Sequence, residues 1–536
     1  MGIFSKIFSG DEVAEKINRA AEVYKLNRFD EAIESYSSAL AIENENTKAL
    51  YGRGLAYAKK GELNSALTDF KNVVRIDKDF SPNCFFHLAE TLFKLKNNTE
   101  ALESVNIFIL KTEKKGHGYF LRGKIFYELG KYDDALKDAE KASELQPDEA
   151  EIFVLLGKIK IRLNEFRQAI IVLKKSLELN NDCDYAHTFL GGAYIFIHKK
   201  DEAENELKQV AKPIKETFFY FSKVHFANND FEKSLDALGD ALSFDENYID
   251  AYFQRIEVYR ELNETGKALE DLQKVIALQP DNIENIMLSA ELNKLNNDFK
   301  SCVRDYNKVL RLDPDNVKAL FELGALSSKT KNHEIALMYF LRVVELDDSF
   351  KEAFFELGKI YFTLEEYQKA INSFSSAISI DEKYFSAYYH RAKVKEILKD
   401  QQGALGDFTR ALGNAEFYEA FIDRAKLKIG SGEFHSAIND LIKAVKLKGE
   451  KDYPHYLLAS CYSKTDKEFD AMRSISTALD LKPTRGEYFY FRGMLYFDSQ
   501  KYSEALADWA QALKLAPQYK SKLELLIQRA KSKVSS

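Results

Sequence analysis

Residues 366–378 read EYQKAINSFSSAI, and this stretch decides the fold because similar stretches recur along the whole chain. Residues 29–40 read FDEAIESYSSAL, residues 131–142 read KYDDALKDAEKA, and residues 501–513 read KYSEALADWAQAL. Each stretch contains an alanine, here called the anchor, followed by an apolar residue. Self-similarity at a fixed period is the sequence signature of a repeat architecture.

The anchors recur about every 34 residues and define fifteen repeats. They fall at Ala32, Ala66, Ala101, Ala135, Ala169, Ala203, Ser234, Ala268, Cys302, Ala336, Ala370, Ala404, Ala437, Ala471 and Ala505. Twelve residues before the anchor stands a second small residue, a glycine in seven repeats, and four residues after it a bulky one recurs. Two small columns indicate two helices that approach closely, with large side chains filling the space around them. The pattern predicts a helix–turn–helix in every repeat.

Glycine, asparagine and proline mark where these helices end. Glycine or asparagine stands five residues before the anchor in eight repeats, as a left-handed cap of the first helix requires. These residues are Asn27, Gly61, Gly130, Asn164, Asn229, Asn263, Asn297 and Gly432. Five of the 8 prolines lie twelve residues after an anchor, where the second helix must stop. Pro82 and Pro454 fall in the first turn of the next repeat, where a missing N–H is harmless.

Length, composition and charge favour a folded helical chain. A chain of 536 residues ordinarily forms three or four domains of roughly 100–200 residues, but the repeats span almost all of it. With 45% hydrophobic and 30% charged residues, the chain has enough apolar material for a continuous core. The formal net charge of -7 provides no general attraction for a phosphate backbone, so nucleic-acid binding is not expected.

The cysteines and the termini favour a cytoplasmic protein. Cys84, Cys183, Cys302 and Cys461 lie too far apart in the sequence for a zinc or redox pair, so reduced, buried thiols are expected. No segment approaches the roughly 18 consecutive apolar residues of a transmembrane helix, and the N-terminus lacks a secretory signal. We expect a cytoplasmic location, with a membrane-peripheral one as the alternative.

A helix–turn–helix repeat with these small and large columns resembles the tetratricopeptide repeat (TPR) family, and the resemblance covers roughly residues 11–517. It implies an all-α fold, a right-handed superhelical solenoid closed by a C-terminal capping helix. We expect an N-terminal amphipathic segment at 1–10, repeats one to six at 11–212, repeats seven to fifteen at 213–517, and the capping helix and tail at 518–536. The step from Ala203 to Ser234 is short and contains Pro213, which predicts a shortened helix and a kink between the two arms.

The resemblance implies a non-enzymatic scaffold or adaptor that binds segments of partner proteins in a concave groove lined by the first helices. Residues fifteen and eleven before the anchor are four apart and share the face expected to line that groove. The first column is aromatic in ten repeats: Tyr51, Phe86, Phe120, Phe219, Phe253, Phe321, Phe355, Tyr389, Tyr456 and Tyr490. The second contains Lys124, Lys158, Lys223, Lys359, Lys393 and Lys426, and Phe93, Tyr127 and Phe226 extend the apolar stripe. Peptide or helical segments with acidic and apolar side chains are the expected partners.

Two alternatives remain open for these columns. The aromatic residues either contact a ligand or fill space between neighbouring first helices, and the lysines either bind acidic groups or are only solvated. One family variant grips the terminal carboxylate of its partner with a clamp of Lys and Asn on successive first helices. That clamp is absent here, since the corresponding positions of the third repeat hold Asn83 and His87. The asparagine ladder of a second variant is also absent at the matching positions. No phosphate loop, nucleophile elbow or paired histidine spacing occurs, so neither an enzyme, a cofactor nor a metal is expected.

The N-terminal residues MGIFSKIF place Ile3, Phe4, Ile7 and Phe8 on one helical face. This segment either covers the apolar end of the first repeat or tethers the chain to a membrane, which makes a membrane-peripheral assembly factor the alternative function. A myristoylation pattern would need Ser or Thr where Lys6 stands.

Overall fold

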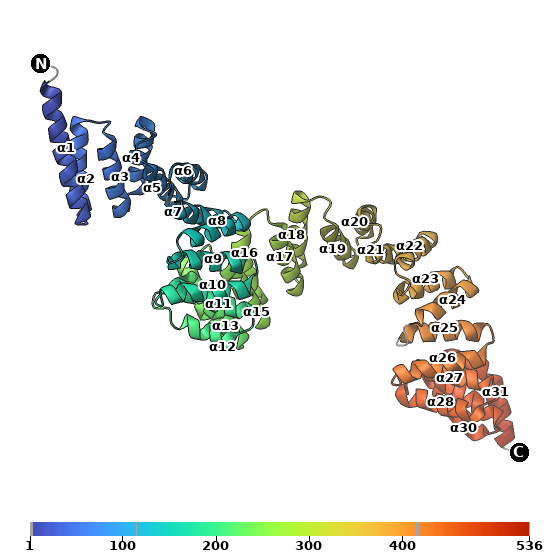
Figure 1. The fold of residues 1–536 in the computed structure, drawn as a ribbon. Helices are drawn as coiled ribbons and strands as arrows, with labels where there is room; N and C mark the ends of the chain where they lie inside the picture. Colours follow the sequence, from blue (N-terminus) through green and yellow to red (C-terminus); the bar gives the residue numbers. More distant parts are fainter. Residues whose placement is uncertain (1–3, 114, 414–416, 535–536) are drawn as a thin grey trace. The chain divides into compact units, whose positions relative to one another are not determined.

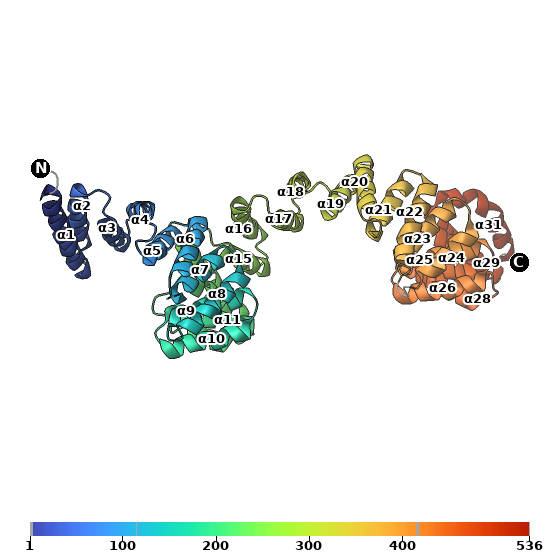
Figure 2. The same ribbon diagram turned by 45° about the horizontal axis from the view of Figure 1, so that its top comes forward.

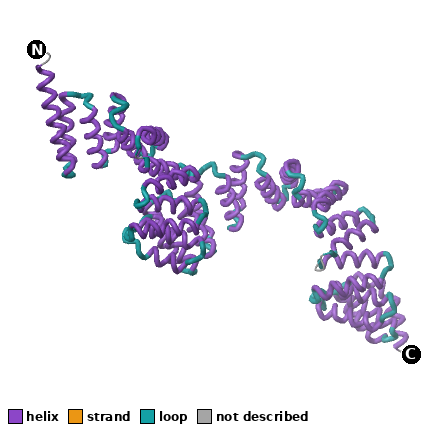
Figure 3. Tube along the Cα trace, viewed as in Figure 1, coloured by secondary structure: helices purple, strands orange, loops and turns teal. Residues whose placement is uncertain are grey.

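The computed structural model describes residues 4–113, 115–413 and 417–534, with side chains from residue 12 onward. Within these ranges the chain forms helices joined by short loops, without any strand (Figure 3). Tertiary contacts divide the chain into two compact modules, Met1–Pro280 and Asp281–Ser536, here called the first and the second module.

The first module contains α1 (Phe4–Lys25), α2 (Phe29–Ile42), α3 (Thr47–Lys60), α4 (Leu63–Ile76), α5 (Pro82–Lys94), α6 (Asn98–Lys111), α7 (Gly116–Glu128), α8 (Tyr132–Leu145), α9 (Ala150–Arg162), α10 (Phe166–Leu179), α11 (Asp184–Phe196), α12 (Lys200–Leu207), α13 (Lys215–Ala227), α14 (Phe231–Phe244), α15 (Ile249–Glu261) and α16 (Thr265–Leu278).

The second module contains α17 (Ile283–Leu295), α18 (Phe299–Leu312), α19 (Val317–Lys329), α20 (His333–Leu346), α21 (Lys351–Thr363), α22 (Tyr367–Ile380), α23 (Phe385–Ile397), α24 (Gln401–Ala411), α25 (Tyr418–Gly430), α26 (Phe434–Leu447), α27 (Asp452–Ser463), α28 (Glu468–Leu481), α29 (Gly486–Asp498), α30 (Tyr502–Leu515), a 3-10 turn (Pro517–Tyr519) and α31 (Lys520–Val534).

Each repeat is a pair of packed helices, the odd-numbered helix first and the even-numbered helix second (Figure 1). All fifteen anchors lie on second helices and are completely buried, including Ser234 and Cys302, which replace alanine. The prediction of fifteen helix pairs around small residues is therefore confirmed.

The close approach of the two helices explains the glycine column. A Cβ atom added to Gly358 would lie 2.5 Å from the ring of Phe374, which is completely buried. In the fourth repeat the corresponding residues are Gly123 and the small Ala139. A Cβ atom added to Gly123 would lie 3.4 Å from its nearest neighbour, the carbonyl oxygen of Ala135. At Gly358 a side chain would therefore collide with the ring of Phe374, although other repeats hold alanine opposite a large ring, as Ala392 does opposite Phe408.

The helix ends also agree with the sequence. All eight glycine and asparagine residues predicted to cap first helices have positive φ, from 58° for Asn263 to 87° for Gly61. The seven other repeats have positive φ at the same place, although the residue there is neither glycine nor asparagine: Lys96, His198, Lys331, Glu365, Lys399, Asp466 and Gln500. Second helices stop two residues before their prolines, as α8 does before Pro147.

The sixth repeat has a shortened second helix. The helix α12 has 8 residues, whereas its neighbour α10 has 14, and α13 does not begin until Lys215. Pro213 lies in the irregular segment between α12 and α13, where its fixed φ and missing N–H interrupt a helix. The shortening is confirmed, and the kink between two arms at this place stays a prediction.

The helix α31 packs against α30 and closes the core of the last repeat. Leu523 is completely buried, and Leu526 and Ile527 pack against the cluster around Trp509, as a capping helix requires. At the other end, α1 begins at Phe4. The predicted tether at residues 1–10 depends on side chains that lie outside the described residues. None of the described helices is long and apolar enough to span a bilayer.

Candidate partner-binding site

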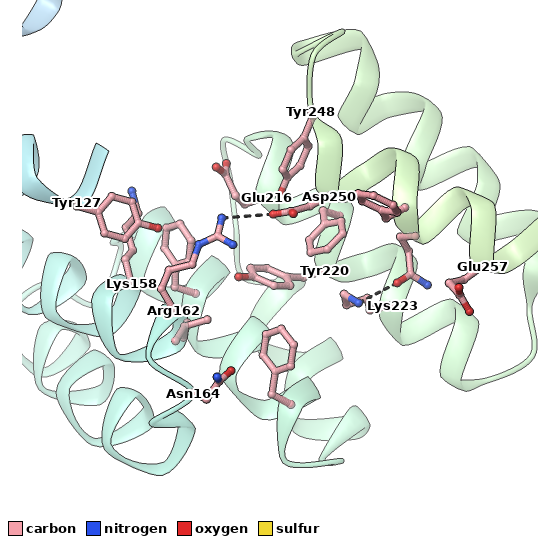
Figure 4. Close-up of a pocket in the computed structure, with 16 residues that line it drawn as sticks. Tyr127, Lys158, Arg162, Asn164, Glu216, Tyr220, Lys223, Tyr248, Asp250 and Glu257 are labelled. Carbon is pink, nitrogen blue, oxygen red and sulfur yellow. Dashed lines mark hydrogen bonds and ion pairs between the residues drawn. The ribbon is translucent and has the colours of Figure 1, made fainter. Parts of the chain in front are cut away.

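A cavity of about 420 Å³ lies on the first helices of the first module. Five consecutive first helices, α7, α9, α11, α13 and α15, supply almost its whole lining. The side chains that line it include Tyr127, Lys158, Arg162, Phe189, Phe196, Glu216, Phe219, Tyr220, Lys223, Tyr248, Asp250, Phe253, Gln254 and Glu257 (Figure 4). Five of the predicted groove residues, Tyr127, Lys158, Phe219, Lys223 and Phe253, therefore meet in one cavity.

Consecutive first helices pack directly on each other around this cavity. The helix α9 packs on α11, and α11 packs on α13 next to the short α12. In both views α9, α10, α11 and α15 gather into one compact group (Figures 1 and 2). Arg162 on α9 reaches Asp250 on α15, three repeats further on, with 3.3 Å between guanidinium nitrogen and carboxylate oxygen. Both residues of this ion pair line the cavity.

Two lysines in the cavity contact aromatic rings. The ammonium group of Lys158 lies 4.7 Å from the ring centre of Tyr127 and 5.2 Å from that of Phe189. The ammonium group of Lys223 lies 5.0 Å from the ring centre of Phe219 and donates a hydrogen bond to Gln254 Oε1 at 2.8 Å. Burial lowers the pKa of both lysines from its ordinary value, because the charged form loses water, and nearby carboxylates such as Glu216 for Lys158 and Asp250 for Lys223 offset only part of that loss.

A second cavity, of about 350 Å³, adjoins the first and shares Tyr127 and Lys158 with it. Its other walls include the predicted groove residues Phe93 and Lys124, with the partly exposed Cys183 at its edge. Lys124 lies 3.9 Å from the ring centre of Phe120 and 3.6 Å from a carboxylate oxygen of Glu151. The two cavities form a track along α5, α7, α9, α11, α13 and α15.

Elsewhere the predicted aromatic column packs between neighbouring rings. Phe355 lies 5.7 Å from Phe374 in its own repeat and 5.1 Å from Tyr384 in the connection to the next, measured between ring centres. Tyr51, Phe321 and Tyr389 have the same two kinds of neighbour. The remaining members contact other rings or stay partly exposed: Phe86 beside Phe108, Tyr456 beside Tyr488, and Tyr490 beside Tyr519. Phe226, which extends the apolar stripe, lies beside Phe231. Phe219 alone in the column is buried, at 8% exposure, and whether the column binds a partner stays a prediction.

The predicted lysines of the second module are paired with carboxylates. Lys359 lies 2.9 Å from Glu356, and Lys426 lies 3.1 Å from Asp423. Lys393 lies 2.6 Å from Glu396 on its own helix, and 3.4 Å from Asp423 on the next first helix. The positive charge of Lys359, Lys393 and Lys426 is therefore largely neutralised by carboxylates of the same chain.

A buried ion pair that recurs in six repeats was not predicted from the sequence. In six repeats an arginine thirteen residues before the anchor bonds through two nitrogens to an aspartate three residues after it. These pairs are Arg53–Asp69, Arg122–Asp138, Arg255–Asp271, Arg391–Asp407, Arg424–Asp440 and Arg492–Asp508. The fixed spacing of sixteen residues could have revealed them, whereas Arg162 and Asp250 carry no such signal.

The described part of the chain contains no group of three or more metal-ligating side chains close enough to hold a metal ion. The four cysteines are unpaired, and Cys84, Cys302 and Cys461 are buried. Burial raises the pKa of Cys84 to about 12 and that of Cys461 to about 11, so both thiols stay protonated near neutral pH.

Family comparisons match separate parts of the repeat array. The family described as TPR repeat matches residues 22–61 and 358–396, and families described as tetratricopeptide repeat match residues 47–80, 126–191, 250–282 and 486–519.

Similar proteins share only part of their length with this chain. A TPR repeat-containing protein of Methanocaldococcus jannaschii is 27% identical over 172 residues, 30% of each chain. Tetratricopeptide repeat protein 13 of Homo sapiens is 28% identical over 189 residues, 34% of this chain and 22% of that protein. This chain thus spans less than a third of the length of either relative.

Solved structures include the APC/C hetero-tetramer Cut9-Hcn1, at 15% identity and a TM-score of 0.34, covering 89% of this chain and 95% of that one. The fifteen helix pairs, the buried anchors and the family matches lead to one conclusion. The chain belongs to the tetratricopeptide repeat family.

Proposed function

We propose that this protein is a non-enzymatic scaffold that captures a segment of a partner protein on the first helices of its first module. The observation that carries the proposal is the cavity of about 420 Å³, to which five consecutive first helices contribute. Cavities of this size, lined by aromatic rings and a few polar groups, are typical of binding sites. The adjoining cavity extends the surface to a length that an extended or helical segment can occupy.

The partners are expected to be other proteins, in keeping with the interaction role of tetratricopeptide repeats. Four unpaired cysteines, three of them buried, fit a reducing, cytoplasmic compartment.

A photo-crosslinking experiment tests the proposal. A benzophenone amino acid replaces Phe253 in the cavity, and in a matched control it replaces Ile171 on α10, a second-helix residue that is 69% exposed. We expect crosslinked partner proteins from position 253 and few from position 171. Crosslinks from position 171 alone, or none from either position, would contradict capture in the groove.

A further inference from the structure

Two positive charges in the larger cavity have no carboxylate partner. Among the described residues, no carboxylate oxygen lies within 4.0 Å of the ammonium group of Lys158, which contacts only the rings of Tyr127 and Phe189. The hydrogen-bond acceptor of Lys223 is the neutral amide oxygen of Gln254. A half-buried ammonium group without a counter-charge is costly, and a bound anion offsets that cost.

The acidic residues of the same cavity are mostly engaged. Asp250 pairs with Arg162 at 3.3 Å, and Glu257 pairs with Arg260 at 2.9 Å. Glu216 is the one carboxylate of the cavity without an ion pair in the described part of the chain. Two unpaired ammonium groups of the larger cavity therefore face one unpaired carboxylate, Glu216, and Glu128 of the adjoining cavity also attracts Lys158.

Aromatic side chains separate the two lysines. Lys158 comes from α9 and Lys223 from α13, and Figure 4 draws them on opposite sides of Tyr220. Tyr220 and Phe219 are both buried, and their rings lie 5.5 Å apart between centres. A ligand that reaches both lysines thus crosses an apolar surface between them.

We propose, resting on the proposed function, that the cavity binds a partner segment in which two acidic side chains flank an apolar one. The acidic side chains pair with Lys158 and Lys223, and the apolar side chain packs on the rings of Phe219 and Tyr220. The adjoining cavity, reached past Tyr127, takes a further apolar side chain of the same segment. Because the acids are side chains, the segment needs no free carboxyl terminus.

Selection of peptides on the full-length protein tests this chemistry. A random library of displayed 12-residue peptides is selected on the wild-type chain, and the enriched peptides are synthesised with amidated ends. We expect acidic residues on both sides of an apolar one, with affinity reduced at least about tenfold by Lys158→Gln with Lys223→Gln. The matched control, Lys359→Gln with Lys393→Gln, removes lysines that are already paired, and we expect no change.

Two further measurements keep the test independent of misfolding. Glu216→Gln removes the free carboxylate, and we expect it to tighten binding of the same peptides about threefold. The reaction of Cys183 with a maleimide reports on the adjoining cavity, because the other three cysteines are buried, and bound peptide should slow it.

Enriched peptides that are basic or uncharged, or that bind the Lys158→Gln and Lys223→Gln variant as well as wild type, would overturn the proposed chemistry while leaving peptide capture intact. A library from which the wild-type chain selects nothing would contradict peptide capture itself, and this inference with it.

Discussion

Lysines in the same column of the repeat have opposite surroundings in the two modules. In the first module Lys158 and Lys223 contact rings and an amide, whereas in the second module Lys359, Lys393 and Lys426 each contact a carboxylate. Equal positions in the sequence pattern therefore differ in the charge they offer to a ligand. In the first module Lys158 and Lys223 keep positive charge available, although Lys124 pairs with Glu151, whereas Lys359, Lys393 and Lys426 of the second module all form internal ion pairs.

The residue three positions before each lysine accounts for most of this difference. Leu155 and Tyr220 precede the free lysines, whereas Glu356 and Asp423 precede Lys359 and Lys426. Residues three apart share a helix face, so an acid in this position pairs with the lysine one turn further on.

The modules differ in their helix ends as well. The left-handed position that ends the first helix holds glycine or asparagine in six of eight repeats in the first module and in two of seven in the second. Glu365 in this position has a φ of 61°, and this left-handed conformation is unfavourable for a residue with a Cβ atom. In the second module these lysines are thus paired with carboxylates, and more of the turns are strained.

The largest expected effect concerns the buried ion pairs of the second module. Asp407→Asn leaves Arg391 uncompensated, in a pair whose side chains are 12% and 4% exposed, and we expect a loss of about 3 kcal/mol in the stability of that repeat. Hydrogen exchange of α23 and α24 in graded denaturant measures it. The control Asp315→Asn breaks the exposed pair with Arg342 and should cost far less, because solvent screens it. Equal losses would show that burial does not strengthen these pairs.

Substitution of two matched glycines should act in opposite directions in the modules. Gly358→Ala forces a methyl group against the ring of Phe374 and should destabilise the second module by about 1–3 kcal/mol. Gly123→Ala in the first module has room beside Ala139 and should stabilise by up to about 1 kcal/mol, because alanine favours the helix. Urea midpoints of both variants measure the difference. Equal effects of the two substitutions on stability would mean that the ring of Phe374 does not make alanine unfavourable at position 358.

The difference between the lysines of the two modules can be tested by removing carboxylates that pair with the lysines of the second module. Glu356→Gln with Asp423→Asn, made in the Lys158→Gln and Lys223→Gln background, removes the carboxylates that pair with Lys359 and Lys426, whereas Lys393 keeps its pair with Glu396. We expect acidic peptides to bind this variant about tenfold more tightly than the background, an effect near 1.4 kcal/mol, measured by fluorescence anisotropy. Unchanged affinity would show that the shape of the first-module cavity, rather than free charge, determines binding.

The smallest expected effect tests the strained turns. Glu365→Gly relieves the left-handed strain of a residue with a Cβ atom and should stabilise the second module by about 1 kcal/mol. The matched change Asn164→Gly in the first module should gain only a few tenths of a kcal/mol, because asparagine tolerates this conformation. Thermal unfolding of both variants makes the comparison. A larger gain at Asn164 than at Glu365 would contradict it.

The sequence by itself determined the repeats, their helix pairs, the buried anchors and the capped ends. These features depend on neighbouring residues and adjacent helices, so a period of about 34 residues reveals them wherever it occurs. The pairing of Lys359 with Glu356 is equally local and could have been predicted from a spacing of three residues along one helix.

Only the tertiary structure decided where the first helices enclose a cavity. Arg162 and Asp250 are 88 residues apart, and they meet in a part of the stack where α9 packs on α11 and α11 packs on α13. Small rotations between successive repeats accumulate along the stack, and their sum determines which distant side chains face each other. No single repeat encodes that sum, so the columns of the sequence do not show that Lys158 and Lys223 share one cavity.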